Sequence, residues 1–384
     1  MSSLTMQYFS RSLLVGLLVL GLACSDDSSN GSNENNETPS VEVESFREAG
    51  PWAAGVTTLS LGDRSVEVWY PASPADVEGL ERDAYFIRDF ISPIFDMVLD
   101  PSISPPFETG AYRDVPASEE GPFPLLLFAH GAASYRLQST FLTSHLATWG
   151  FVVASVDYLE RGLGVASFGP EPEIPIEDDV LTGMVVDLLD TENAAAGGLL
   201  EGRVSTSELG MTGHSAGGGT TIRFASDPRV IAYAPLSAGI FDPDTTSLPD
   251  KPSLWLTGDI DGIVELDRVQ TAFGEASTPT RLVVLEDMGH LGPSEICAIG
   301  ANGGGVIQLA MDGGIELSEG LIRLGTDGCQ DEAVSPADGW IPVNHFITAF
   351  FRDAFGLDDE PIGLSQSVEV EIPEVSFTYE EALE

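Results

Sequence analysis

The chain contains two kinds of hydrophobic pattern, and both predict β-strands. Residues 56–61 and 65–70 alternate apolar and polar side chains, which is typical of antiparallel strands with one buried face. The later strands are continuously apolar runs, as expected where a sheet is buried on both faces. These runs lie at 124–130, 151–157, 208–213, 229–236, 252–258 and 280–287.

Helical spacing recurs between the buried runs. After 124–130, Leu137, Phe141, Leu142 and His145 are spaced for one face of a helix. Further helices are predicted at 178–194, 218–226 and 344–355. Buried strands joined by helical crossovers predict an α/β fold, with a mostly parallel central sheet covered by helices on both faces.

The first 23 residues have the pattern of an export signal. Arg11 supplies a positive charge, the apolar run 13–22 is too short to span a bilayer comfortably, and polar sequence follows Cys24 abruptly. This pattern resembles a bacterial lipoprotein signal, in which Cys24 is lipidated and becomes the first mature residue, although Gly21 stands where that signal prefers leucine. The alternative is ordinary cleavage nearby with Cys24 incidental. Both interpretations predict an exported protein, either lipid-anchored in the bacterial cell envelope or secreted.

Three regions follow the signal. Residues 24–44 form the expected polar tether, because 25–40 contain no apolar side chain able to nucleate packing. Residues 45–356 are long enough for one folded domain with a substantial core. The remaining segment, 357–384, is expected to be an acidic C-terminal tail.

Acidic side chains dominate the charge. Asp and Glu number 61 against 16 Lys and Arg, and the formal net charge is −45. Such a charge repels phosphate backbones and anionic lipid headgroups, which argues against nucleic acid as a partner. We interpret the acidity as a solvated surface that aids solubility, with a specific cation-binding role as the alternative.

The sequence "MTGHSAGGGTT", residues 211–221, places a serine between a predicted strand and a predicted helix. A sharp turn there would raise Ser215 above the sheet, and glycines at 213 and 217 would avoid clashes with neighbouring backbone. The positive end of the following helix favours negative charge near the hydroxyl. The alternative, a Gly-rich loop with an incidental serine, does not account for the flanking strand and helix. Ser215 is therefore the predicted nucleophile.

A serine hydroxyl needs a base to act as a nucleophile at neutral pH. His290 follows the last predicted strand and lies on the same sheet edge as Ser215, so it is the predicted base. Packing or loop-shaping roles are predicted for the other four histidines, His130, His145, His214 and His345.

The base needs a carboxylate to fix its tautomer, and "WLTGDIDGIV" supplies two just beyond a strand. Asp261 is preferred, because the spacing from Gly258 to Val264 resembles the acid loop of α/β hydrolases, whose chain order is also Ser, Asp, His. Asp259 is the alternative acid. A calcium loop is a rival interpretation of "DIDG", but the ligand spacing and terminal glutamate of such loops are missing.

Two main-chain amides are predicted to stabilise the developing oxyanion. In this architecture one follows the nucleophile, at Ala216, and the other lies in the loop after the first parallel strand, at Ala132. This chemistry requires no metal and no organic cofactor.

Cys297 and Cys329 form an even pair in a chain bound for an oxidising compartment, which favours a disulfide. Two buried free thiols are the alternative. The segment between them is rich in glycine, so local propensity does not order it. A bridge would restrain this segment and the nearby loop that carries His290.

Several quoted stretches together resemble a known family. "GPWAAGVTTLSL", "VEVWYPA", "PLLLFAHGAASYRLQSTFLTSHLATWGFVVASVDY" and "GHSAGGGTT" are similar to secreted α/β hydrolases grouped with bacterial platelet-activating-factor acetylhydrolases, predicted dienelactone hydrolases and polyester-degrading cutinases. The resemblance covers residues 50–295 and the last helix. It implies Ser215, Asp261 and His290 as the catalytic triad, and Ala132 and Ala216 as the oxyanion donors. These motifs are specific for the fold and weak for the substrate.

The chain departs from this family at several points. Dienelactone hydrolases use a cysteine nucleophile, so Ser215 argues against that reaction. Cutinases carry an aromatic residue where Ala132 stands. Two segments look inserted, near 80–114 and 292–341, and they are expected to cover the cleft. A covered site fits a small soluble ester better than a polymer chain.

The sequence therefore predicts an exported serine hydrolase that cleaves small carboxylic esters through an acyl-enzyme. We expect a monomer that meets membranes only through its lipid anchor. The alternatives are a phospholipid-type acetylhydrolase or lipase, a polyester hydrolase, and, from another class, a non-catalytic binding protein with a hydrolase fold.

Overall fold

The computed structural model describes residues 45–97, 104, 106–241, 246–301 and 304–384. The predicted signal peptide, Cys24 and the polar tether lie outside these residues. Within the described ranges, no helix is long and apolar enough to cross a lipid bilayer.

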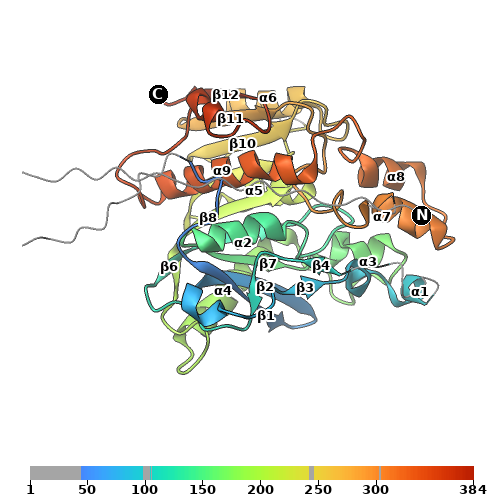
Figure 1. Ribbon diagram of the computed structural model, residues 1–384, viewed down its shortest axis with the longest axis horizontal. Coiled ribbons are helices and arrows are strands. Elements are labelled where there is room, and N and C mark those ends of the chain that lie inside the picture. The colour runs from blue at the N-terminus through green and yellow to red at the C-terminus, as the bar shows by residue number, and fades with distance from the viewer. Residues whose placement is uncertain (1–44, 98–103, 105, 242–245, 302–303) are drawn as a thin grey trace, which may run out of the picture. The chain divides into compact units, whose positions relative to one another are not determined.

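A ten-stranded sheet lies at the centre, in the order β12-β11-β10-β9-β8-β6-β7-β2-β1-β5 (Figure 1). The strands from β7 to β11 run parallel, whereas β2 pairs antiparallel with β7 and β1, and β12 with β11. The strands of this sheet are β1 (Ala53–Leu61), β2 (Arg64–Ala72), β5 (Tyr112–Arg113), β6 (Phe123–Ala129), β7 (Val152–Val156), β8 (Val204–His214), β9 (Val230–Leu236), β10 (Ser253–Gly258), β11 (Thr280–Leu285) and β12 (Phe377–Ala382). A separate two-stranded sheet contains β3 (Ala84–Tyr85) and β4 (Phe107–Glu108).

Helices cover both faces of the large sheet (Figure 1). On one face lie α2 and α9, and on the other α4, α5 and α6. Side chains alternate between the two layers along β6: Leu126 belongs to one apolar core, and Leu125 and Leu127 belong to the other. This arrangement confirms the predicted α/β-hydrolase fold class. The covering helices are α2 (Thr140–Thr148), α4 (Asp178–Ala194), α5 (Ala216–Phe224), α6 (Leu266–Glu275) and α9 (Pro336–Ala354).

Four short helices gather at one end of the sheet (Figure 1). They are α1 (Pro93–Asp96), α3 (Leu163–Ala166), α7 (Gly305–Asp312) and α8 (Glu319–Thr326). The predicted insertions supply three of them, α1 from the first and α7 and α8 from the second. The Cys297–Cys329 disulfide is confirmed, and it closes the loop that carries α7 and α8.

The segment 357–384 is not the tail that its acidity indicates. Its last part forms β12, which pairs with β11 along six residue positions. Phe377 is buried and meets Phe346 of α9 at a centroid distance of 5.0 Å, whereas Glu380 and Glu381 are exposed. Phe377 and Tyr379, two positions apart, thus face the core from an edge strand, and the neighbouring acidic side chains stay solvated.

Candidate active site

Ser215 stands at the turn between β8 and α5 with a φ of +57°, in the left-handed region that non-glycine residues seldom adopt. A Cβ atom at position 213 would lie 2.6 Å from the Gly217 carbonyl oxygen. At position 217 it would lie 2.0 Å from the Ala129 carbonyl oxygen of β6. Only glycine fits at either position, and this close approach of strand and helix holds the turn in its strained form.

The structure brings Ser215, His290 and Asp261 together. The Ser215 hydroxyl lies 2.8 Å from His290 Nε2, and His290 Nδ1 lies 2.9 Å from Asp261 Oδ2. The side chains of His290 and Asp261 are fully buried. The second carboxylate oxygen of Asp261 accepts hydrogen bonds from the amides of Ile263 and Val264, at 2.9 and 2.8 Å. The acid is therefore fixed at both oxygens, and it sets the histidine tautomer that leaves Nε2 free to accept the serine proton.

Asp259, the alternative acid, has another role in this arrangement. It is exposed, and its Oδ1 accepts a hydrogen bond from the amide of Asp287 at 2.8 Å. This contact joins the turn after β10 to the turn after β11. Asp259 thus braces the loop that leads to His290, and it does not contact the histidine ring.

The loop after β6 offers one free amide near Ser215. The Gly131 amide donates to Gln138 Oε1 at 2.7 Å, and the Ala133 amide donates to the Arg161 carbonyl at 2.7 Å. Between them, the Ala132 amide has no backbone acceptor among the described residues, and the same holds for Ala216 at the start of α5. Both residues flank the Ser215 turn, so the two predicted oxyanion donors keep their N–H groups available.

A buried chain of hydrogen bonds connects this loop to the base. The Gln138 amide contacts His214 Nδ1 at 2.6 Å, and His214 Nε2 contacts the His290 carbonyl at 2.7 Å. Burial, and then the neighbouring His290, lower the pKa of His214 to about 3, so its ring stays neutral. The sequence suggests packing for His214 and gives no signal for Gln138. Their connection of two separate loops appears only in three dimensions.

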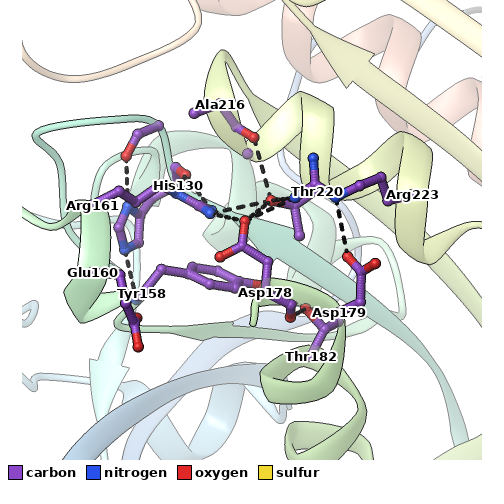
Figure 2. A network of polar contacts seen from close by, with 12 residues as sticks. His130, Tyr158, Glu160, Arg161, Asp178, Asp179, Thr182, Ala216, Thr220 and Arg223 are labelled. Atoms are coloured by element: carbon purple, nitrogen blue, oxygen red, sulfur yellow. Dashed lines mark hydrogen bonds and ion pairs between the residues drawn. The ribbon is translucent and has the colours of Figure 1, made fainter. Parts of the chain in front are cut away.

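A second network lies beneath the same loop, as Figure 2 shows. Arg161 donates twice to the His130 carbonyl, at 3.1 and 2.9 Å, and it also contacts Asp178 and Thr220. Thr220 belongs to α5 and donates to Asp178 at 2.7 Å. His130 accepts the Tyr158 amide at 3.0 Å, consistent with its predicted loop-shaping role. Arg161 thus joins the loop after β6 to α5, the helix that follows Ser215.

Asp327, in the second insertion, connects the loop that carries Asp261 to the loop that carries His290. Its carboxylate accepts the His290 amide at 2.7 Å and the Gly262 amide at 3.2 Å. Its carbonyl also accepts the amide of Leu291 at 2.9 Å. Arg323, one turn earlier on α8, donates to the Gly262 carbonyl. No motif marks Asp327 in the sequence, because its partners lie 37 and 65 residues away.

Ser215 and His290 open into a cavity of about 160 Å³, which we call the apolar chamber. Its walls come from the loop after β6, from α3 and from both predicted insertions. The apolar lining includes Ile87, Phe95, Leu163, Ile296, Leu309 and Leu324. Across the described ranges, no group of three or more His, Cys, Asp or Glu side chains could hold a metal ion.

No protein-family model matches the chain, and a search of curated proteins finds no match. One of the matching solved structures is a ferulic acid esterase from Streptomyces cinnamoneus, at 22% sequence identity and a TM-score of 0.56. The match covers 86% of this chain and 97% of that chain. At this identity the likeness shows a shared fold, in agreement with the sheet topology described above.

Proposed function

We propose that the chain is a serine hydrolase that cleaves carboxylic esters. One observation carries this proposal: the Ser215 hydroxyl lies 2.8 Å from His290 Nε2, whose other nitrogen lies 2.9 Å from a buried Asp261. The amides of Ala132, which lines the same cavity as Ser215, and of Ala216, the next residue in the chain, have no backbone acceptor among the described residues. The fold shared with a structure titled an esterase supports the same reaction class.

In this proposal, His290 takes the Ser215 proton as the oxygen attacks the ester carbonyl. The amides of Ala132 and Ala216 stabilise the tetrahedral oxyanion. His290 then gives its proton to the departing alcohol oxygen, which leaves an acyl-enzyme on Ser215. Water, activated by the same histidine, attacks the acyl carbonyl and releases the acid. Asp261 keeps the imidazole oriented and stabilises its protonated form, and no cofactor takes part.

A fluorophosphonate tests the nucleophile, because Ser215 Oγ would form a bond to phosphorus as fluoride leaves. We expect stoichiometric labelling of the wild type and none of Ser215→Ala, together with loss of p-nitrophenyl ester hydrolysis. Labelling elsewhere, or turnover by pure Ser215→Ala, would refute the assignment. Circular dichroism should show that Ser215→Ala keeps its fold. Labelling of the wild type but not of this folded variant would also exclude a non-catalytic binding protein.

Asp261 and Asp259 form a matched pair for the acid. Asp261→Asn should reduce kcat by about 10⁴-fold, because the amide favours the wrong histidine tautomer. Asp259→Asn should change kcat little, since its carboxylate bonds the Asp287 amide and, among the described residues, no group of the proposed triad. Steady-state kinetics on one ester measure both variants, and the opposite ranking would assign the acid to Asp259.

The proposal extends to location and to a finer family. We infer an exported monomer, lipid-anchored at Cys24, that is akin to the acetylhydrolase and cutinase group. A disulfide fits an oxidising compartment. Metabolic labelling with a clickable fatty acid should tag the wild type and not Cys24→Ala. If the wild type is not tagged, the alternative of ordinary signal cleavage followed by secretion is favoured.

A further inference from the structure

Much of the wall of the apolar chamber is built by parts of the chain that lie outside the family motifs. Ile87 and Phe95 come from the first insertion, and Leu309 and Leu324 from the second. The Cys297–Cys329 bridge closes the second segment. The family resemblance therefore says nothing about this wall, and its chemistry must be read from its own residues.

Charge is almost absent from the lining. Among the described residues that line the chamber, none is an aspartate, glutamate or lysine. Arg88 is present, but its Nε and Nη2 both contact Asp96 Oδ1, at 2.8 and 2.6 Å. The hydroxyls of Ser104 and Ser134 have no hydrogen-bond partner within the described part of the chain. Such hydroxyls can bond a neutral group, but they cannot compensate a buried charge.

The helices of the second insertion present apolar side chains that the protein leaves partly uncovered. Leu309 and Ala310 of α7 and Leu324 of α8 are half-buried, although all three line the chamber. Polar residues such as Gln308 and Glu319 occupy exposed positions on the same two helices. An apolar ligand would remove the remaining surface of the lining from water, which is favourable in proportion to the area covered.

From this lining we infer that the chamber binds the hydrocarbon acyl chain of an uncharged ester, and that the enzyme prefers acyl chains longer than acetyl. This inference rests on the proposed function and names its substrate class. The acyl group, not the alcohol, is the assigned occupant. The acyl group is bonded to Ser215, which lines the chamber, from the first chemical step until water releases it in the second, whereas the alcohol leaves in the first.

A series of p-nitrophenyl esters tests the preference with a fixed leaving group. From acetate to octanoate, kcat/KM should rise about fourfold per methylene until the chamber is filled. The monoester of adipic acid, whose terminal carboxylate would meet no partner, should fall at least tenfold below the hexanoate ester. A flat series, or an equal rate for the charged ester, would overturn the inference while leaving ester hydrolysis intact.

Ala310→Phe and Gln308→Phe form a matched pair on α7. Phenylalanine at 310 projects into the chamber, so octanoate hydrolysis should fall at least tenfold and acetate hydrolysis less than twofold. Phenylalanine at 308 lies on the exposed face and should change neither rate. Equal losses for both esters in Ala310→Phe, or the same pattern in Gln308→Phe, would contradict an acyl site at this wall.

A binding measurement separates the two proposals. Calorimetry of Ser215→Ala with p-nitrophenyl octanoate should show binding with a negative heat-capacity change, and Ala310→Phe in the same background should weaken it at least tenfold. If no ester is hydrolysed but this binding holds, the proposed function fails and the apolar site stands. If esters are hydrolysed but binding is unaffected by Ala310→Phe, the site fails alone.

Discussion

The proposed nucleophile, Ser215, and the proposed base, His290, are held in place by two different kinds of structure. Around Ser215, backbone from β6, β8 and α5 packs so closely that only glycine fits at positions 213 and 217. Around His290, by contrast, the restraint is a carboxylate, Asp327, which lies in an insertion and accepts the amides of His290 and Gly262. The first restraint is steric and belongs to the core of the fold. The second is polar and peripheral, and it comes from a predicted insertion.

The two restraints should therefore affect two different quantities, the free energy of unfolding and the positioning of the catalytic groups. A steric restraint shared by core elements fails only when the core shifts, so damage there should appear as lost folding free energy. A hydrogen-bonded restraint can fail while the core survives, so damage there should appear as lost kcat.

The steric side should show the largest effect. In Gly217→Ala the new Cβ would lie 2.0 Å from the Ala129 carbonyl oxygen, so strand and helix must separate. We expect a loss of about 4 kcal/mol or more of unfolding free energy, measured by urea denaturation. Gly219→Ala is the control on the same helix, because its nearest neighbour is the end of Arg223 at 3.5 Å. That change should be neutral or slightly stabilising, and equal losses at both positions would rule out the steric explanation.

The disulfide comes next in size. It closes a loop of 32 residues, which corresponds to roughly 3 to 4 kcal/mol in the chain-entropy account. The Cys297→Ser, Cys329→Ser double variant should therefore unfold at a lower temperature. It should also lose kcat at temperatures where the core remains folded, because Asp327 lies two residues before Cys329. Full kcat in the folded double variant would mean that the bridge is structural alone.

Asp327 itself tests precision without a large change in stability. Asp327→Ala removes the acceptor for two loop amides, and a displacement of the base by about 1 Å costs on the order of 10²-fold in kcat. KM should change little, since Asp327 does not line the chamber. Asp327→Asn keeps one oxygen and should lose less activity.

Asp331→Ala serves as the control for Asp327, because it changes an exposed acid in the same segment. It should keep wild-type kcat. If Asp327→Ala and Asp331→Ala behave alike, the base loop is held by other contacts and the contrast with the nucleophile disappears.

The same contrast explains what could be predicted from the sequence. Strand–turn–helix patterns and close-packed glycines are local, so the parallel strands β6 to β11 and the predictions of Ser215, His290 and Asp261 rest on residues that are close together in the sequence. The cysteine pair is predictable for another reason, because the sequence predicts an oxidising compartment, where two thiols favour a disulfide.

The rest of the site depends on contacts between distant segments. Gln138, Arg161 and Asp327 look like ordinary surface or loop residues in the sequence, and their partners lie in other elements. The acidic composition of 357–384 predicts a tail, but Phe377 and Tyr379 pack on Phe346 of α9 and β12 pairs with β11. Tertiary packing, which no local window contains, decides such cases.

The smallest expected effect is a difference in pH dependence between the two regions. His214, on the nucleophile strand, is buried beside His290, and its pKa is lowered to about 3. Glu295, in the second insertion, is buried, and burial raises the pKa of its carboxyl to about 8 despite hydrogen bonds from Thr140, Tyr85 and Phe141. These shifts oppose each other between about pH 4.5 and 6.5, whereas His214 acts alone below this range and Glu295 acts alone above it.

The signs follow from the protons that each state binds. Below pH 6.5 the unfolded chain protonates His214 and the folded chain does not, so unfolding free energy falls as pH drops from about 6.5 toward 3. Between about 4.5 and 8 the folded chain keeps a proton on Glu295 that the unfolded chain has lost, so unfolding free energy falls as pH rises. Each slope is limited to about 1.4 kcal/mol per pH unit. Urea denaturation of the wild type, His214→Gln and Glu295→Gln from pH 4 to 9 measures both slopes. The slope below about pH 4.5 should shrink only in His214→Gln and the slope above about pH 6.5 only in Glu295→Gln, whereas unchanged slopes in both variants would place the responsible groups elsewhere.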